Sequence, residues 1–306
     1  MIRYVVKRLM MLVPVLFGVT LVSFSLLQIV PGDPAVLLAG EDANPEFIEA
    51  VRKEYGFDQP LHVQYLRFVA RAVQGDFGIS IRNREPVIRL LLQRFSFTVQ
   101  LSFLSILIAA AIGLVAGVVS ATRQYSLFDH ASMVGALLGI SMPIFWLGLL
   151  LMLVFSVHLR WFPAGGSGEL RHLILPAIAL GAASAAVIAR MTRASMLEVI
   201  RQDYIRTARA NGLRETVVIY KHALKNAMIP VITVFGLEFG YMLGGAVLTE
   251  TVFSLPGVGR LMVEGIFQRD YAVVQGAMLL VATTFVLVNL LTDIAYALFD
   301  PKIRYE

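Results

Sequence analysis

Residues 95–122, FSFTVQLSFLSILIAAAIGLVAGVVSAT, form a stretch of 28 residues without a charged side chain. At about 1.5 Å per residue, a helix of this length exceeds the roughly 30 Å hydrocarbon core of a bilayer. Five further apolar runs cover residues 9–30, 130–157, 173–189, 227–249 and 271–292, and Glu238 is the one acid among them. Since a charge near the bilayer centre costs roughly 2.5–3.5 kcal/mol, we expect an all-α membrane protein with six transmembrane helices.

The composition agrees with lipid as the solvent of much of the chain. Of the 306 residues, 58% are hydrophobic and 15% are charged, whereas soluble domains hold roughly 45–50% apolar and about 25% charged residues. The absence of cysteine excludes disulfides, thiolate metal sites and cysteine nucleophiles. The formal charge of +5 is typical of Lys and Arg gathered in cytoplasmic loops, so it does not indicate a nucleic-acid partner.

The first apolar run follows Arg3, Lys7 and Arg8, as the core of a signal peptide would. However, it is longer than the roughly 7–15 apolar residues of a signal peptide, and no small-x-small cleavage pattern follows it. We therefore expect this run to be a retained helix.

The distribution of Lys and Arg predicts the orientation of the chain. If the N-terminus is cytoplasmic, the cytoplasmic segments hold fourteen of the 26 basic residues, and the short outer loops hold four, Arg160, Arg171, Arg260 and Arg269. The other eight lie in the 31–94 loop, which is long enough to cross the membrane largely regardless of its charge. Both termini are therefore expected in the cytoplasm.

This orientation divides the chain into three parts. Residues 1–30 are the cytoplasmic N-terminus and first helix, residues 31–94 are an outer loop, and residues 95–306 are a five-helix core. A cytoplasmic loop at 190–226 interrupts this core between its third and fourth helices.

The outer loop is expected to be helical. Asn44-Pro45-Glu46 combines a cap, a first-turn proline and an acid at a helix start, and Gly56 is a typical helix end. Two further helix signals follow, Asp58 with Pro60, ending near Gly75, and Pro86, leading into the second span. Packing on the membrane domain is the expected role of these helices, and contact with a delivery protein is the alternative.

Small residues recur every four positions in two of the spans. One set is Ala109, Gly113, Gly117 and Ala121, and the other is Gly236, Gly240 and Gly244. This spacing places each set on one helix face, where it allows the close approach of a neighbouring helix. A compact helical bundle is therefore expected.

The cytoplasmic loop contains DYIRTARANG at residues 203–212. Asp203 suits the first turn of a short helix, and Gly212 suits its end. Helical spacing places Tyr204, Ala208 and Gly212 on one face, while Arg206 and Arg209 point elsewhere. Such a small, flat stripe can fit a groove in a partner protein. A basic helix lying on anionic headgroups is the alternative.

The same stretch resembles the EAA loop of ABC-importer permeases. Arg206-Thr207-Ala208 stands where that pattern has Glu-Ala-Ala, Gly212 is its glycine, and Lys225 occupies its usual proline position. The departure at Lys225 is similar to the peptide-permease branch. Further matching pieces, over nearly the whole chain, are residues 222–230, Pro31-Gly32-Asp33-Pro34, Gly75-Asp76-Phe77-Gly78, Met191-Thr192-Arg193, 253–260 and Arg269-Asp270-Tyr271. The chain thus resembles the dipeptide, oligopeptide, nickel and glutathione permease family, in its first-permease type.

This resemblance implies an ABC type I importer permease fold in a bacterial or archaeal cytoplasmic (inner) membrane. The expected function is to form part of the import pore for dipeptides, oligopeptides or related solutes such as glutathione, a nickel chelate or haem. The implied partners are a homologous second permease, two cytoplasmic ATPase subunits, an external solute-binding protein and the lipid bilayer. The expected ATPase-coupling residues are Asp203, Tyr204, Arg206, Thr207, Ala208, Arg209 and Gly212, and the expected outer-gate residues are Pro256, Gly257, Gly259 and Arg260. No cofactor is expected on this chain, since ATP and Mg²⁺ belong to the ATPases.

Glu238 is a candidate for the translocation path on geometric grounds. It lies midway along the fifth span, where an ionised carboxylate facing lipid would be costly. At about 100° per residue it is opposite the Gly236 and Gly240 stripe, with Met242 and, less closely, Tyr241 on its own side. A structural acid that is hydrogen-bonded to a neighbouring helix is the alternative.

Other function classes fit the sequence less well. No Gly-x-x-x-x-Gly-Lys-Ser/Thr motif is present, so ATP hydrolysis by this chain is not expected. The five histidines are scattered without metal-ligand spacing. A secondary transporter or channel is the main alternative, but such proteins usually carry several polar groups at the midplane and paired repeats. A membrane-embedded enzyme would need paired acids or a histidine cluster within the spans, and the predicted spans contain neither.

Overall fold

The computed structural model describes residues 2–29, 33–40 and 43–299, and helices make up most of this part of the chain. The Pro31-Gly32 piece of the sequence motif and the basic residues Lys302 and Arg304 lie outside the described residues. The elements are α1 (Ile2–Ile29), α2 (Pro34–Ala39), α3 (Pro45–Tyr55), α4 (Leu61–Val73), α5 (Val87–Thr122), α6 (Leu127–Ser141), α7 (Ile144–Leu151), the π-helical η1 (Met152–His158), α8 (Arg171–Ile200), α9 (Asp203–Ala210), α10 (Glu215–Val217), the π-helical η2 (Val218–Ala223), α11 (Leu224–Val252), α12 (Val258–Phe267) and α13 (Tyr271–Phe299).

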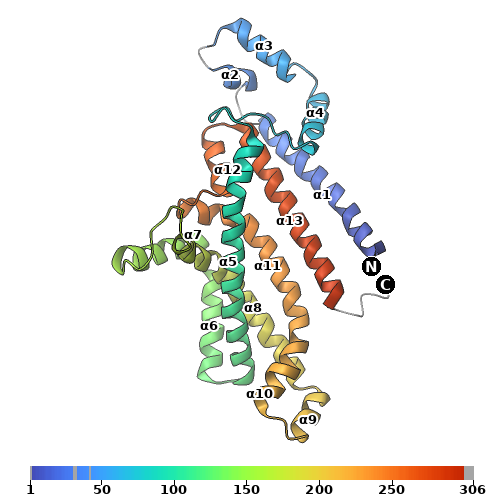
Figure 1. Ribbon diagram of the computed structural model, residues 1–306, viewed down its shortest axis with the longest axis vertical. Coiled ribbons are helices and arrows are strands. Elements are labelled where there is room, and N and C mark those ends of the chain that lie inside the picture. Colours follow the sequence, from blue (N-terminus) through green and yellow to red (C-terminus); the bar gives the residue numbers. More distant parts are fainter. Residues whose placement is uncertain (1, 30–32, 41–42, 300–306) are drawn as a thin grey trace.

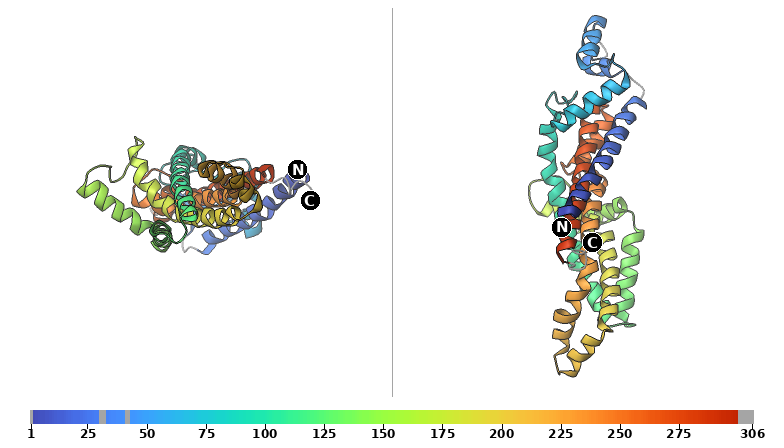
Figure 2. Two further views of the ribbon diagram at one scale, coloured as in Figure 1. Left: turned by 90° about the horizontal axis from the view of Figure 1, so that it is seen from below. Right: turned by 90° about the vertical axis from the view of Figure 1, so that its right-hand side faces the viewer.

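The helices form an elongated bundle (Figure 1). α5, α8 and α11 run along the long axis, with α9 and α10 at one tip and α2, α3 and α4 at the other. α1 and α13 pack on each other, and the start of α1 lies close to the end of α13, as both views in Figure 2 show. The predicted outer loop and the predicted cytoplasmic loop therefore lie at opposite ends of the molecule.

Within the described residues, four helical segments are individually long and apolar enough to cross a membrane. They are Val87–Thr122, Arg171–Ile200, Glu215–Val252 and Tyr271–Thr292. A fifth candidate is the bent pair Leu127–Ser141 and Ile144–His158, and α1 contains a shorter apolar helix at Leu9–Ser25. The all-helical membrane class is thus confirmed, with four or five spans by length and composition and a further apolar helix in α1.

The third predicted run is not one straight helix. The 130–157 run divides at Met142 and Pro143 into two helices that bend by 108°. Pro143 lacks an N–H and disfavours helical backbone at the residue before it, and Met142 accordingly has extended backbone. The prediction of a single helix here was wrong, because the hydropathy of the run is uninterrupted across the break.

The helix signals of the outer loop are largely confirmed. The Asn44 side chain accepts a hydrogen bond from the Glu46 N–H, and Gly56 closes α3 with left-handed backbone at φ +71°. α4 begins after Pro60 without a side-chain cap, and Pro86 directly precedes α5. α2 was not predicted from the sequence, and Asp33 caps it by accepting a hydrogen bond from the Ala35 N–H at 2.9 Å.

Small residues bring α5 and α8 into close contact, as their spacing predicts. A Cβ atom on Gly113 would lie 2.7 Å from Ile188 Cγ2, and one on Gly117 would lie 2.5 Å from Thr192 Cβ. In the second stripe, Gly236 and Gly240 pack against α13, whereas a Cβ on Gly244 would meet no atom within 4 Å. Two glycines of that stripe therefore serve helix packing within this chain, and the third faces outward.

Candidate functional site

The predicted coupling helix is present as α9, at the tip of the molecule farthest from the outer loop (Figure 1). Asp203 lies in its first turn, where an acid complements the positive end of the helix dipole. Gly212 follows the helix with φ +75°, a backbone conformation that residues with a Cβ rarely adopt. The helix and its glycine stop agree with the prediction.

The predicted docking face of α9 needs a correction. Ala208 is buried, with 8% of its surface exposed, and Ile205 is fully buried beside it. Both belong to an apolar cluster that contains residues from α5, α8, η2 and α11, among them Val118, Met196, Val218 and Ala227. Ala208 is therefore not part of a free docking surface, because it packs with Ile205 into the chain's own core, whereas Tyr204 and Gly212 remain exposed.

The exposed side of α9 carries the other predicted residues. Asp203, Tyr204, Arg206, Thr207, Arg209 and Ala210 are all exposed. The Tyr204 hydroxyl accepts a hydrogen bond from Asn226 Nδ2 at 2.7 Å, which joins α9 to α11. Arg209 donates to both carboxylate oxygens of Glu215, at 2.7 and 3.2 Å, and this hydrogen bonding raises the pKa of the Arg209 guanidinium. α9 is thus fixed to the rest of the chain on one side and open on the other.

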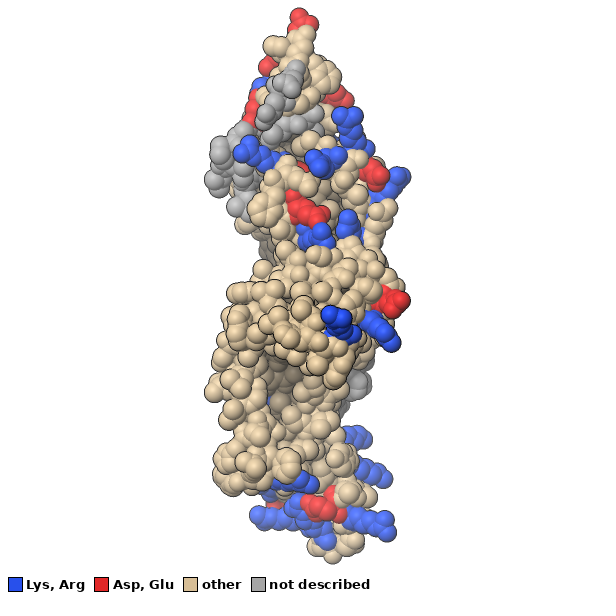
Figure 3. Space-filling model, turned by 90° about the vertical axis from the view of Figure 1, so that its left-hand side faces the viewer, with Lys and Arg blue, Asp and Glu red and all other residues tan. Residues whose placement is uncertain are grey.

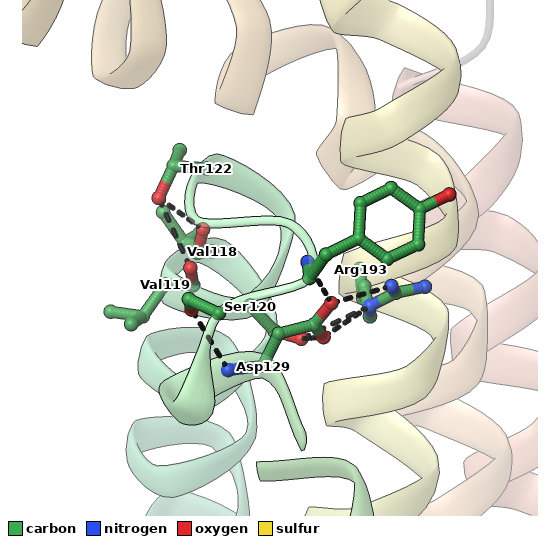
Figure 4. A network of polar contacts seen from close by, with 8 residues as sticks. Val118, Val119, Ser120, Thr122, Asp129 and Arg193 are labelled. Atoms are coloured by element: carbon green, nitrogen blue, oxygen red, sulfur yellow. Dashed lines mark hydrogen bonds and ion pairs between the residues drawn. The ribbon is translucent and has the colours of Figure 1, made fainter. Parts of the chain in front are cut away.

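A polar network joins α5, α6 and α8 (Figure 4), next to the parts of α5 and α8 that pack on α9. Arg193 on α8 donates to Asp129 in the first turn of α6, and its Nε also lies 3.0 Å from Ser120 Oγ on α5. Asp129 also accepts from Ser120 Oγ and from the Tyr125 N–H. Arg193 was predicted only as part of a motif, and Asp129 was not predicted. The Ser126 N-cap three residues earlier is the signal that places Asp129 in a first turn.

The three path candidates on α11 are placed differently from one another. Glu238 is half-buried and accepts a hydrogen bond from Ser184 Oγ on α8, opposite the side on which Gly236 and Gly240 meet α13. Tyr241 is 61% exposed, whereas Met242 is fully buried in the apolar core. Met242 therefore presents no surface to a path, because its side of α11 packs within the chain.

The predicted outer-gate residues lie at the start of α12. Pro256 precedes Gly257, which is the N-cap residue of the helix, and Gly259 lies in its first turn. Arg260 donates from Nε to Glu264 Oε1 at 2.8 Å and from Nη1 to the Ser254 carbonyl at 2.6 Å. The buried Glu250, which was not predicted from the sequence, places its carboxylate against this turn.

Charged side chains are distributed unequally along the surface (Figure 3). The lower tip in this view is mostly blue, the upper tip mixes blue and red, and the part between them is mostly tan. The basic tip is the region of α9 and α10. This arrangement is typical of a membrane protein whose basic loops share one side.

Comparison with known proteins identifies the family. The family described as "Binding-protein-dependent transport system inner membrane component" matches residues 113–305, and its N-terminal companion, described as "Binding-prot-dependent transport system membrane comp, N-term", matches residues 1–102. The glutathione transport system permease protein GsiC of Escherichia coli (strain K12) is 48% identical over 306 residues, with all of both chains covered. The dipeptide transport system permease protein DppB of Alkalihalophilus pseudofirmus is 46% identical, again with both chains fully covered.

Solved structures share the fold at lower identity. An inward-facing form of the MetNI methionine ABC transporter superposes with a TM-score of 0.60 at 19% identity, covering 69% of this chain and 96% of the other. An amino acid ABC transporter gives a TM-score of 0.52 at 16% identity, covering 70% of this chain and 94% of the other. Together with the helical membrane architecture, these matches show that the chain belongs to the binding-protein-dependent family of inner-membrane permease subunits of ABC importers, the components that form the pathway and do not hydrolyse ATP.

Proposed function

We propose that this permease imports glutathione, dipeptides or closely similar peptide-like solutes. The observation that carries this proposal is the identity of 48% and 46%, over the full length of both chains, to a glutathione permease and a dipeptide permease. Oligopeptides belong to the same solute class, and a nickel chelate or haem is the alternative cargo that the sequence resemblance implies. The proposed assembly contains a homologous second permease, two cytoplasmic ATPase subunits and an external solute-binding protein.

In the proposed topology both termini are cytoplasmic and the α2–α4 region is external. Three observations support it. The tip formed by α9 and α10 is strongly basic, the α2–α4 region lies at the opposite tip, and the start of α1 and the end of α13 lie side by side. The positive-inside rule then places α9 in the cytoplasm. Cysteines introduced at residues 43–85 should be labelled from outside intact cells. Labelling only after lysis would show that the topology is inverted.

The exposed side of α9 is the proposed contact with an ATPase subunit. Ile205 and Ala208 fix the other side of α9 to the ends of α5, α8 and α11. Because these contacts are apolar and buried, a force applied to α9 would move those helix ends together with it. This arrangement supports α9 as the element that transmits closure of the ATPases to the pathway.

The proposed path-facing surface is the exposed side of α11. Leu237, Tyr241 and Leu248 are each more than half exposed, and Gly244 is exposed between them. Their spacing of three to four residues places them on one face of the helix. Glu238 lies next to Leu237 at the edge of this face, where its carboxylate can contact a peptide-like solute in addition to Ser184. In the proposed assembly, this surface faces the second permease across the path.

The experiment that tests the solute class uses the purified complex with its ATPases. ATPase activity is measured with each candidate binding protein, loaded with glutathione, a dipeptide, a nickel chelate or haem. We expect stimulation by glutathione or a dipeptide. Stimulation only by a nickel chelate or haem would reject the proposed solute.

A further inference from the structure

The first turn of α12 is held by a carboxylate from a neighbouring helix. Glu250, near the end of α11, is 1% exposed, and its Oε2 accepts a hydrogen bond from the Arg260 N–H at 3.1 Å. Its Oε1 accepts from Thr98 Oγ1 on α5 at 2.6 Å. The Thr98 oxygen in turn accepts from the Val258 N–H at 2.9 Å. Two N–H groups that the helix itself leaves free are thus satisfied by α11 and α5.

Two glycines make room for this carboxylate. A Cβ atom on Gly257 would lie 2.1 Å from Glu250 Cδ. One on Gly259 would lie 3.0 Å from Glu250 Oε2 and 2.5 Å from Val247 Cα. Since real Cβ atoms do not approach other atoms this closely, the glycines and Glu250 form one close-packed arrangement. The Pro256-Gly257-Val258-Gly259 stretch is therefore shaped by contact with Glu250.

The partners of Glu250 all donate hydrogen bonds to it. The Thr98 hydroxyl and the Arg260 N–H both donate, and the positive end of the α12 dipole faces the carboxylate. A glutamine at this position has nearly the same size but would present an NH₂ group where the carboxylate presents an acceptor. Substitution by glutamine therefore changes the hydrogen bonding with little change in volume.

A second buried carboxylate lies just beyond the other end of α12. Asp270 is 1% exposed, and its Oδ2 accepts from Ser80 Oγ at 2.5 Å and from the Arg82 N–H at 3.4 Å. Ser80 belongs to the part of the outer loop that joins α4 to α5. The two carboxylates thus connect both ends of α12 to the stretch of chain between residues 80 and 98.

We propose that Glu250 is a positioning residue that locks α12, the end of α11 and the start of α5 into one rigid unit at the outer end of the pathway, and that import requires this lock. The inference rests on the proposed import function. A rigid unit anchored to the outer loop through Asp270 moves as one body when the pathway opens or closes. Without the lock, α12 moves separately and ATP hydrolysis is no longer coupled to import.

The first test is the Glu250→Gln variant in the complete complex, with Glu169→Gln as the matched control, because Glu169 is exposed and lies in a different outer loop. We expect Glu250→Gln to assemble and to lower solute import per ATP hydrolysed by at least about tenfold, since a mispaired buried donor shifts an equilibrium by this order. Glu169→Gln should behave as wild type. Import per ATP at the wild-type level in Glu250→Gln would overturn the proposal, and so would an equal loss of assembly and ATPase activity. Absence of import by the wild type would contradict the proposed function instead.

A second test measures the rigid unit directly. The chain has no native cysteine, so spin labels can be placed at Leu92→Cys on α5 and Phe267→Cys on α12, two exposed positions. The proposal expects the same narrow distance distribution with and without ATP in the wild type, and a broader one in Glu250→Gln. Thr98→Ser should keep the narrow distribution, whereas Thr98→Val should broaden it. A distance that changes with nucleotide in the wild type, or stays narrow in Glu250→Gln, would refute the rigid unit.

Discussion

The guanidinium of Arg193 on α8 forms two parallel hydrogen bonds with the carboxylate of Asp129 on α6, from Nε to Oδ1 at 2.8 Å and from Nη2 to Oδ2 at 2.9 Å. The Asp129 side chain is 4% exposed and that of Arg193 is 25% exposed. A two-pronged contact of this kind fixes orientation as well as distance. It therefore holds the start of α6 against α8 at the level where α9 is attached.

Removing one partner of this pair should destabilise the permease. Asp129→Asn leaves Arg193 without its counter-charge, and we expect a loss of about 3 kcal/mol, the lower end for a buried pair because Arg193 is partly exposed. The measurement is the denaturant midpoint of the solubilised subunit. Reversing the pair with Asp129→Arg and Arg193→Asp should recover part of the loss. A midpoint equal to wild type in Asp129→Asn would show that the pair contributes nothing.

The two sides of α9 should respond differently to the same substitution. Ala208→Glu places a charge in the apolar cluster beneath α9, so we expect lower stability of the subunit itself. Ala210→Glu lies on the exposed side, so the subunit should remain stable while binding of the ATPase is lost. Thermal unfolding of the subunit and co-purification of the ATPase separate the two effects. Normal ATPase binding and import by Ala210→Glu would show that the docking surface lies elsewhere.

Gly212 should tolerate asparagine better than alanine. Its φ of +75° is unfavourable for alanine, whereas asparagine adopts this region more readily, and no neighbouring atom would meet a Cβ there. We expect Gly212→Ala to lower stability by about 1 kcal/mol and Gly212→Asn by less. Thermal unfolding of the two variants checks this order. Equal midpoints would mean that the turn relaxes without strain.

Glu238 should matter for import more than for assembly. Glu238→Gln keeps a partner for Ser184, whereas Glu238→Leu removes it. If Glu238 contacts the solute, both variants should assemble, and import should change in each and be lowest in the leucine variant. Uptake and co-purification of the subunits are measured separately. Normal uptake by Glu238→Leu, or loss of assembly in both variants, would reject a path role.

Local signals in the sequence predicted much of this fold. Asn44 and Gly56 correctly marked the ends of α3, and the glycines at 113 and 117 correctly indicated close helix packing. Each of these features depends on neighbours within a few residues or on one helix face. They could therefore be inferred without the tertiary structure.

Other features depend on contacts that are distant in the sequence. Glu250 meets Thr98 across 152 positions, and Arg193 meets Asp129 across 64. Neither pairing has a local pattern, so sequence analysis could not find it. The buried side of α9 was misassigned for a similar reason, because the cluster that covers Ile205 comes from four other elements.

Transport by the complete complex in proteoliposomes shows whether this chain forms an import pathway driven by ATP. Uptake of labelled glutathione or a labelled dipeptide is measured with the binding protein on the side of the α2–α4 region and ATP on the side of α9. We expect uptake that requires both ATP and the binding protein and persists when ion gradients are collapsed. Uptake that needs an ion gradient and continues without ATP would contradict it and indicate a secondary transporter.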